Sequence, residues 1–416
     1  MRAPELVDGL ARPSDEAGPS DGATPTDGAA PTDGRPRDAG SVGPVGRDVA
    51  TPGDALLRWW ARIERLPTWC FLAWVAALLI ARSGVSWSGF DELLRFGREF
   101  PRPGTTFRSN AVLGPAFSWL TRADSPTRWL VLHGVVTAAW FAAVVVLLRR
   151  AVGSARQWRV AVVWLSFVSS TTSLLRHLGA YDVFTLWGAA LVALGGATWT
   201  SIVGGALMGA TNAEQGLLAL CCGALVHWAL PRVDGPGDTS ARSRVDERST
   251  LAVIGPALGG LVVARLVVLV WFGQLGAEVQ GRSQAFGELL RDALTNASSL
   301  GGTGAYSWLG AGWVLVLVTL WYLRHHPFRW VAVACGVVLV PAAATVTTLD
   351  GSRVFCAVSA VALLVLLVRV VPRVEHPDGS WMLRGAAALM LVGLLVPAIN
   401  TTYRGGIRIP WRFFLG

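Results

Sequence analysis

The sequence contains no lysine at all, and all 36 of the basic residues among its 416 are arginine. Charge is scarce in general, because charged residues make up only 15% of the chain while hydrophobic residues make up 52%. The mean hydropathy is positive, at +0.47. A water-soluble domain with this composition would expose large apolar patches, so the composition excludes one and predicts a membrane protein.

Several families of functional motif are also missing. The sequence has no P-loop, no Rossmann glycine pattern, no His-Glu-x-x-His and no Gly-x-Ser-x-Gly. Its 5 cysteines lie in apolar runs without metal-ligand spacing to histidine, and we interpret them as small apolar side chains. The formal net charge of +9 comes without any nucleic-acid-binding module, so we expect no nucleic acid partner.

The first 55 residues differ from the rest of the chain. They are rich in Pro, Gly, Asp, Ser and Thr, and a Pro-Thr-Asp-Gly motif occurs twice. Such a segment cannot bury enough apolar surface to offset its ordering entropy, so residues 1–55 are predicted to be a disordered cytoplasmic tail. The tail has no apolar stretch near its start and is not a signal peptide, which leaves membrane targeting to the first span.

Residues 56–416 are predicted to form an all-α, polytopic transmembrane bundle of about ten spans. The stretch 200–230 is longer than an ordinary span and is interrupted by the polar run Thr211 to Gln215. We therefore expect it to form two shortened helices that meet at a polar turn. The other apolar runs lie at 67–82, 128–148, 159–175, 183–198, 251–272, 305–323, 330–347, 354–371 and 383–399.

The distribution of arginine predicts the orientation. If 200–230 crosses the membrane twice, the arginine-rich connections fall on one side, which the positive-inside rule makes the cytoplasm. The chain is then a multi-pass protein of the cell's inner (plasma) membrane, with a cytoplasmic N-terminus and an extracytoplasmic C-terminus. Two large outer loops follow, at 83–127 and 273–304. The C-terminal arginines break the rule.

Polar residues from distant parts of the chain share the outer side in this topology. They come from outer loops and from helix ends, which is what an extracytoplasmic site needs. The candidates are Asp91, Glu92, Arg176, His177, Asp182, Asn212, Glu214, Asp350 and Arg353.

Each candidate also has a structural alternative. Asp91 or Glu92 is either a general base or metal ligand, or part of the solvated face of an interfacial helix. Arg176 or His177 binds phosphate oxygens while Asp182 orients a partner, or Arg176 snorkels and Asp182 caps a helix.

Two further pairings are open. Glu214 lies at the predicted helix break and Arg265 lies within an apolar run, where an unpaired ion is costly, so the two form either a structural ion pair or part of the site. Arg353 either pairs locally with Asp350, or it binds a phosphate above the N-terminus of the helix that begins at Asp350.

Taken together, residues 60–400 resemble the GT-C superfamily of polytopic membrane glycosyltransferases. The resemblance lies in the cytoplasmic start, the large first outer loop that opens with the acidic pair Asp91 and Glu92, and the short, broken middle helices. The acids here are adjacent, whereas many such enzymes carry a spaced Asp-x-Asp pair.

The resemblance implies transfer of a sugar from a polyprenyl-phosphate donor to a glycan or lipid acceptor on the outer face, with a divalent cation as a possible cofactor and membrane lipids as partners. Asp91 would then be the base, with Glu92 second, and Arg265, Arg353 and Arg176 would be phosphate ligands. A lipid-linked glycan transporter or flippase, an O-antigen-type polymerase or ligase, and a scaffolding protein are the alternatives.

Overall fold

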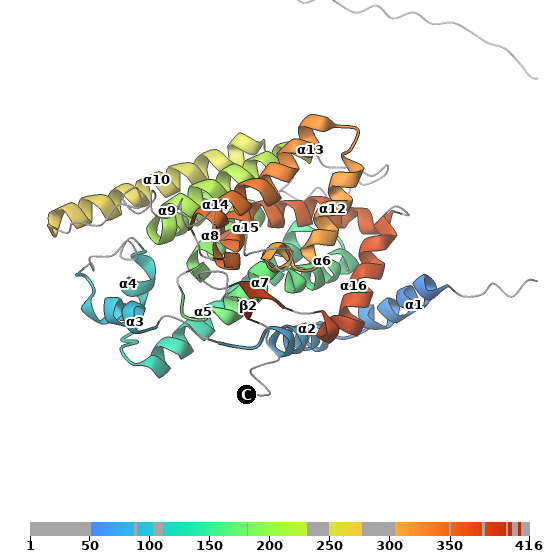
Figure 1. Ribbon diagram of the computed structural model, residues 1–416, viewed down its shortest axis with the longest axis horizontal. Helices are drawn as coiled ribbons and strands as arrows, with labels where there is room; N and C mark the ends of the chain where they lie inside the picture. The colour runs from blue at the N-terminus through green and yellow to red at the C-terminus, as the bar shows by residue number, and fades with distance from the viewer. Residues whose placement is uncertain are drawn as a thin grey trace, which may run out of the picture. The chain divides into compact units, whose positions relative to one another are not determined.

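Helices make up nearly all of the described chain (Figure 1). The computed structural model describes residues 51–86, 90–102, 111–180, 182–230, 249–276, 304–348, 351–376, 379–396, 398–401 and 407–408. Its α-helices are α1 Pro52–Glu64, α2 Thr68–Ser83, α3 Phe90–Glu99, α4 Leu113–Leu120, α5 Pro126–Ala151, α6 Ala155–Phe167, α7 Ser169–Arg176, α8 Asp182–Leu194, α9 Thr198–Ala229, α10 Thr250–Gln274, α12 Gly312–Tyr322, α13 Pro327–Ala334, α14 Val340–Thr348, α15 Gly351–Val370 and α16 Ser380–Val392. Strands β1 Asn400–Thr401 and β2 Ile407–Arg408 form a short antiparallel ladder.

The chain is a helical membrane protein. Four helical segments are long and apolar enough to cross a bilayer, and the bent pair α6 and α7 could form a fifth span. Shorter apolar helices occupy other runs that the sequence marks as spans. The total of about ten spans stays a prediction. The four long segments are Pro126–Ala151, Thr250–Gln274, Pro327–Thr347 and Ser352–Glu375.

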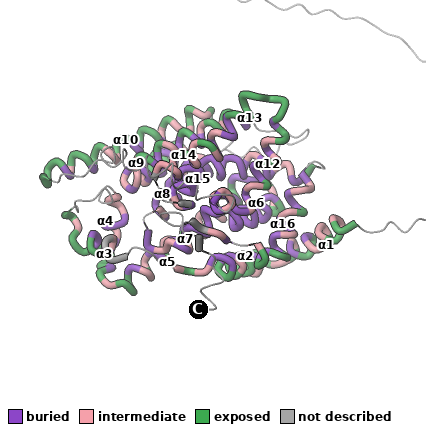
Figure 2. The backbone as a smooth tube through the Cα atoms, in the orientation of Figure 1, coloured by how far each residue is buried: buried purple, intermediate pink, exposed green. Residues whose placement is uncertain are grey.

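Helix α15 lies at the centre of the bundle. Its segment Ser352–Glu375 has the highest hydropathy of the four, 2.8, and 94% of its apolar window is buried inside the protein (Figure 2). Helix α10 is its opposite, because only 22% of its window is buried. Exposed apolar side chains on a membrane helix face lipid, so α10 is peripheral while α15 contacts other helices on all sides.

Helices α9 and α10 cross very closely at small residues. A Cβ on Gly205 would lie 1.8 Å from the Ala257 carbonyl oxygen, and one on Gly260 would lie 2.1 Å from the Ile202 carbonyl oxygen. Glycine therefore lets the two backbones touch here, which is the usual way in which membrane helices gain packing energy.

The predicted break within 200–230 is confirmed, and it lies at Asn212. This residue has non-helical angles (φ −151°, ψ 87°), and its side-chain oxygen accepts a hydrogen bond from the Gln215 backbone N–H at 3.3 Å. A Cβ on Gly216 would lie 2.6 Å from the Met208 Cβ, whereas residues eight apart in an unbroken helix are separated by about 12 Å. The chain therefore turns sharply at Asn212, which acts as the N-cap of the second half of α9.

Replacing Asn212 by alanine should lower stability modestly. The Asn212→Ala variant loses the acceptor for the Gln215 N–H, and loss of an N-cap typically costs about 1 kcal/mol. Unfolding in mixed detergent and SDS micelles should show this decrease. Asn212→Ser retains a capping oxygen and should unfold close to wild type, and equal losses in both variants would contradict the capping role.

A second break, which the sequence analysis did not predict, divides the run 159–175. Helices α6 and α7 meet at Val168 with a 56° bend. Arg82 of α2 is only 2% exposed and donates through Nη1 to the Ser166 carbonyl at 3.3 Å and through Nη2 to the Phe167 carbonyl at 3.5 Å. The guanidinium satisfies carbonyls that the break frees from the helical ladder.

Both ends of the described chain differ from expectation in detail. Helix α1 begins at Pro52, before the predicted tail boundary at 55, behind a capping box formed by Thr51 and Asp54. The Thr51 hydroxyl and the Thr51 backbone N–H both donate hydrogen bonds to the Asp54 carboxylate. These bonds lower the pKa of that carboxyl, and the hydroxyl has the larger effect. The last predicted span, 383–399, is helical only to Leu395, where a short 3₁₀ turn ends.

Candidate functional site

A polar pocket lies where α7 ends and α8 and α15 begin. About 330 Å³ of space lies between its walls, part of it open to the outside. Three predicted site residues from distant parts of the chain line it, namely His177, Asp182 and Arg353. The other lining residues are Thr137, Ser170, Ser173, Leu174, Leu178, Gly179, Ala180, Val183, Leu186, Cys356 and Ala357.

An ion pair crosses this pocket. The Arg353 Nε lies 2.9 Å from Oδ2 of Asp182, with the two side chains 34% and 18% exposed. Each residue opens a helix, since Asp182 is the first residue of α8 and Arg353 lies in the first turn of α15. Arg353 therefore pairs across the bundle with Asp182, in addition to any local contact with Asp350, which lies outside the described residues.

Helix α7 supplies hydroxyl groups to the same pocket. Ser170, Ser173 and His177 are spaced three and four residues apart, which places them on one helical face, and all three line the pocket. Thr171 and Thr172 turn away and donate to the Leu165 and Ser169 carbonyls at 2.6 and 3.0 Å. The Ser-Thr-rich sequence of α7 thus divides into a pocket face and a face that satisfies backbone carbonyls.

Arg176 is buried, so the alternative in which it snorkels is wrong. It is 4% exposed, and its Nε donates to the Ser83 carbonyl at the end of α2 at 2.7 Å. Ser86, which follows α2, exchanges backbone hydrogen bonds with Leu175 and Leu178 at 3.1 and 3.2 Å. Arg176 therefore ties the start of the first outer loop to the rim of the pocket.

The remaining candidates lie on neighbouring elements. Asp91 and Glu92 are in the first turn of α3, and their side chains lie outside the described residues. The first outer loop reaches the α9 break, because the Val112 N–H donates to the Ala210 carbonyl at 3.0 Å. Loop 83–127 therefore contacts both the pocket rim and the turn at Asn212.

Glu214 is exposed in the first turn after the α9 break, and Arg265 is half-buried in the middle of α10. Gly216 packs against Leu261, one helical turn before Arg265, since a Cβ on Gly216 would lie 3.1 Å from the Leu261 Cδ1. The break and this part of α10 are therefore adjacent. An ion pair between Glu214 and Arg265 stays a prediction.

Sequence reasoning missed several polar residues near this site. Ser170, Ser173 and Thr137 lie inside apolar runs and carry no motif, so only the packing of α5 and α7 around the pocket reveals them. His133, one turn before Thr137 on α5, is 1% exposed, and its ring nitrogens have no hydrogen-bond partner among the described residues. Its ring lies 4.6 Å from that of Trp129.

The described lining of the pocket does not by itself form a site for a divalent cation. Among the described lining residues there is one carboxylate, Asp182, and that group already faces Arg353. Hard divalent cations need several oxygen ligands. Within the described part of the chain, no three His, Cys, Asp or Glu side chains are grouped to hold a metal.

Comparison with known proteins found no match to this chain among family models, curated proteins or solved structures.

Proposed function

We propose that the chain is a membrane glycosyltransferase that moves a sugar from a polyprenyl-phosphate donor to a cell-envelope glycan or lipid acceptor on the extracytoplasmic face. The observation that carries this proposal is the pocket that joins His177, Asp182 and Arg353 at one end of the bundle. A fixed guanidinium, an orienting carboxylate and nearby hydroxyls suit a phosphate-linked sugar better than an apolar cargo.

The chemistry assigns a role to each group. The acceptor hydroxyl oxygen attacks the anomeric carbon as the bond from that carbon to the phosphate oxygen breaks, and the lipid phosphate leaves with the electron pair. Arg353 faces the charge that develops on this leaving group, while Asp182 holds the guanidinium in place. Ser170, Ser173 and His177 bind sugar hydroxyls. The acceptor proton passes to Asp91, or to Glu92, on α3.

The direct test is sugar transfer by the purified full chain from labelled polyprenyl-phosphate sugars to membrane acceptors. We expect transfer by the wild type and at least a tenfold slower reaction in Asp91→Asn, because the variant removes the base. Glu99→Gln, on the last turn of the same helix, is the matched control and should stay close to wild type.

The outcomes separate the alternatives. An Asp91→Asn enzyme as fast as the wild type removes the base assignment, and no transfer from any donor rejects the glycosyltransferase. Helices broken at Val168 and Asn212 also favour a transporter, since broken helices build midplane sites. Uptake of a lipid-linked glycan into vesicles without transfer would identify that function, and formation of longer glycans would identify a polymerase or ligase.

A further inference from the structure

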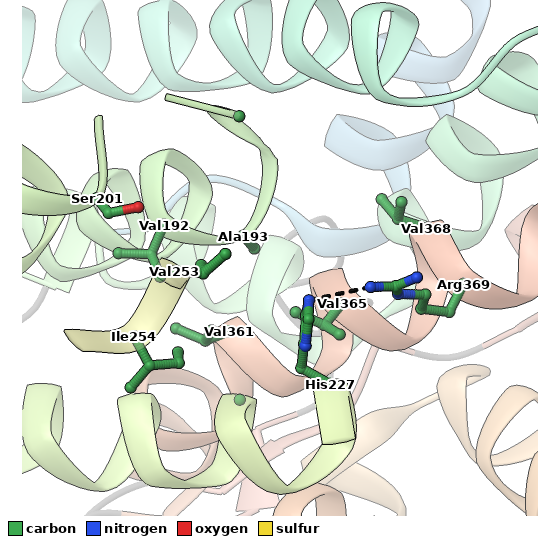
Figure 3. Close-up of a pocket in the computed structure, with 12 residues that line it drawn as sticks. Val192, Ala193, Ser201, His227, Val253, Ile254, Val361, Val365, Val368 and Arg369 are labelled. Atoms are coloured by element: carbon green, nitrogen blue, oxygen red, sulfur yellow. Dashed lines mark hydrogen bonds between the residues drawn. The ribbon is translucent and has the colours of Figure 1, made fainter. Parts of the chain in front are cut away.

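A second pocket lies between the other ends of α8 and α15 (Figure 3). It holds about 550 Å³ of space and opens to the outside. Its walls are mainly apolar, and its lining residues are Val192, Ala193, Gly196, Ser201, Gly223, His227, Val253, Ile254, Val361, Val365, Val368 and Arg369.

The two pockets lie toward opposite ends of α8 and α15. Helices α8 and α15 carry Asp182 and Arg353 at their starts, and residues near their other ends, Ala193 and Arg369, line the second pocket. Arg353 and Arg369 are sixteen positions apart, which is about 24 Å along an α-helix. The bilayer hydrocarbon is about 30 Å thick, so an α15 that spans the membrane would carry the two guanidiniums near opposite interfaces. In the predicted orientation the second pocket is on the cytoplasmic side.

The polar end of this pocket is a defined chain of hydrogen bonds. The Arg369 Nη2 lies 3.0 Å from the His227 Nε2, and the His227 Nδ1 lies 2.9 Å from the Thr250 Oγ1. A guanidinium only donates, so Nε2 accepts and the imidazole proton is on Nδ1, from which it is donated to Thr250. His227 is therefore neutral and orients Arg369, whose side chain Figure 3 shows at one end of the lining.

This end of the pocket borders the lipid. Trp228 and Leu251, the chain neighbours of His227 and Thr250, are 58% and 82% exposed. An exposed tryptophan is typical of the lipid interface. Among the described lining residues Arg369 carries the permanent charge and none is acidic. The described lining is thus cationic at its polar end and apolar along its valine and isoleucine wall.

We propose that this pocket binds the phosphate group of a membrane lipid. Arg369 contacts the phosphate, neutral His227 holds the guanidinium in position, and the wall around Val253 and Val365 takes the first part of the lipid tail. A phosphate-bearing lipid matches both properties, because its head is an anion and its tail is apolar. The inference is independent of the proposed transferase.

Binding to the purified full chain in neutral detergent tests this proposal, with calorimetry as the readout. The probes are a short-chain phosphatidylglycerol, farnesyl phosphate and inorganic phosphate. We expect at least one lipid phosphate to bind, and Arg369→Gln to weaken it roughly ten- to a hundredfold, as loss of a charge-assisted hydrogen bond does. Arg373→Gln is the matched control, because Arg373 lies over the Tyr322 ring, 5.7 Å from its centroid, and does not line the pocket.

The probes distinguish the sources of the phosphate. Binding of phosphatidylglycerol alone assigns the site to bulk phospholipid, and binding of farnesyl phosphate alone assigns it to an isoprenoid phosphate. Inorganic phosphate that binds as tightly as the lipids overturns the proposal, as does equal weakening by Arg369→Gln and Arg373→Gln. If Arg369→Gln does not fold, Val253→Trp tests the same pocket, since it keeps every charge and fills the apolar wall. Unchanged lipid binding in that variant overturns the proposal.

Discussion

Arg353→Gln should lower the rate of sugar transfer by about 10²- to 10³-fold in kcat, the usual effect of removing one group that stabilises transition-state charge. The guanidinium lines the polar pocket and lies 2.9 Å from Asp182, where in the proposed reaction the departing phosphate gains charge. Glutamine is a shorter polar side chain that can still donate hydrogen bonds, but it carries no charge. Single-turnover kinetics on the purified chain would isolate this step.

A double variant separates catalysis from folding. Arg353→Gln alone leaves the Asp182 carboxylate without its guanidinium, and because these side chains are 34% and 18% exposed the loss of stability should be on the order of 1–2 kcal/mol, less than for a fully buried pair. The Asp182→Asn/Arg353→Gln double variant removes both charges and should recover most of this stability. Transfer should remain as slow as in the single variant.

The control for the single and double variants is a different ion pair of the chain. Arg128 and Asp124 form an i,i+4 pair at 3.0 Å with side chains 66% and 60% exposed, and Arg128→Gln should leave both stability and transfer nearly unchanged. If the double variant regains transfer together with stability, the pair is structural only, and Arg353 has no role in the reaction.

Gly260→Ala should destabilise the protein by about 2–3 kcal/mol, within the range for overpacking a tight contact. The added methyl would lie 2.1 Å from the Ile202 carbonyl oxygen, a backbone atom that cannot rotate away. Helices α9 and α10 must then separate, which loosens every contact along their crossing. Unfolding in mixed detergent and SDS micelles would measure the change.

The neighbouring glycine provides a close control. A Cβ on Gly259 would meet nothing within 4 Å, so Gly259→Ala should be neutral or should stabilise α10 by up to about 1 kcal/mol through helix propensity. Equal destabilisation by the two variants would show that backbone flexibility of α10, rather than its contact with α9, accounts for the effect.

Local polarity in the sequence predicted part of this architecture. The interruption at Asn212 and Glu214 predicted the α9 break because a polar residue within an apolar run is costly unless it has a structural use. The sequence analysis also placed Asp182 and Arg353 among the candidates on one side of the bundle, but it paired Arg353 with Asp350 or a phosphate and did not predict the ion pair with Asp182.

Other features depend on contacts that the sequence does not reveal. The bend at Val168 lies in a Ser-Phe-Val-Ser segment without proline or glycine, and its freed carbonyls are satisfied by Arg82, 84 and 85 positions away. His227 and Arg369 are 142 positions apart and have no motif in common. Such pairs arise from packing between helices, which apolar periodicity does not encode.

The central position of α15 has a consequence for how the protein is made. Helices α7, α8 and α9 contact α15, yet all three precede it in the chain and enter the membrane before it is synthesised. Until then, lipid or other helices must cover the faces that carry Ser170, Ser173 and Gly223. The most apolar of the four long spans, with a hydropathy of 2.8, must therefore leave the lipid after insertion and dock into a bundle that is already largely assembled. The core of this protein is completed only late in its biosynthesis.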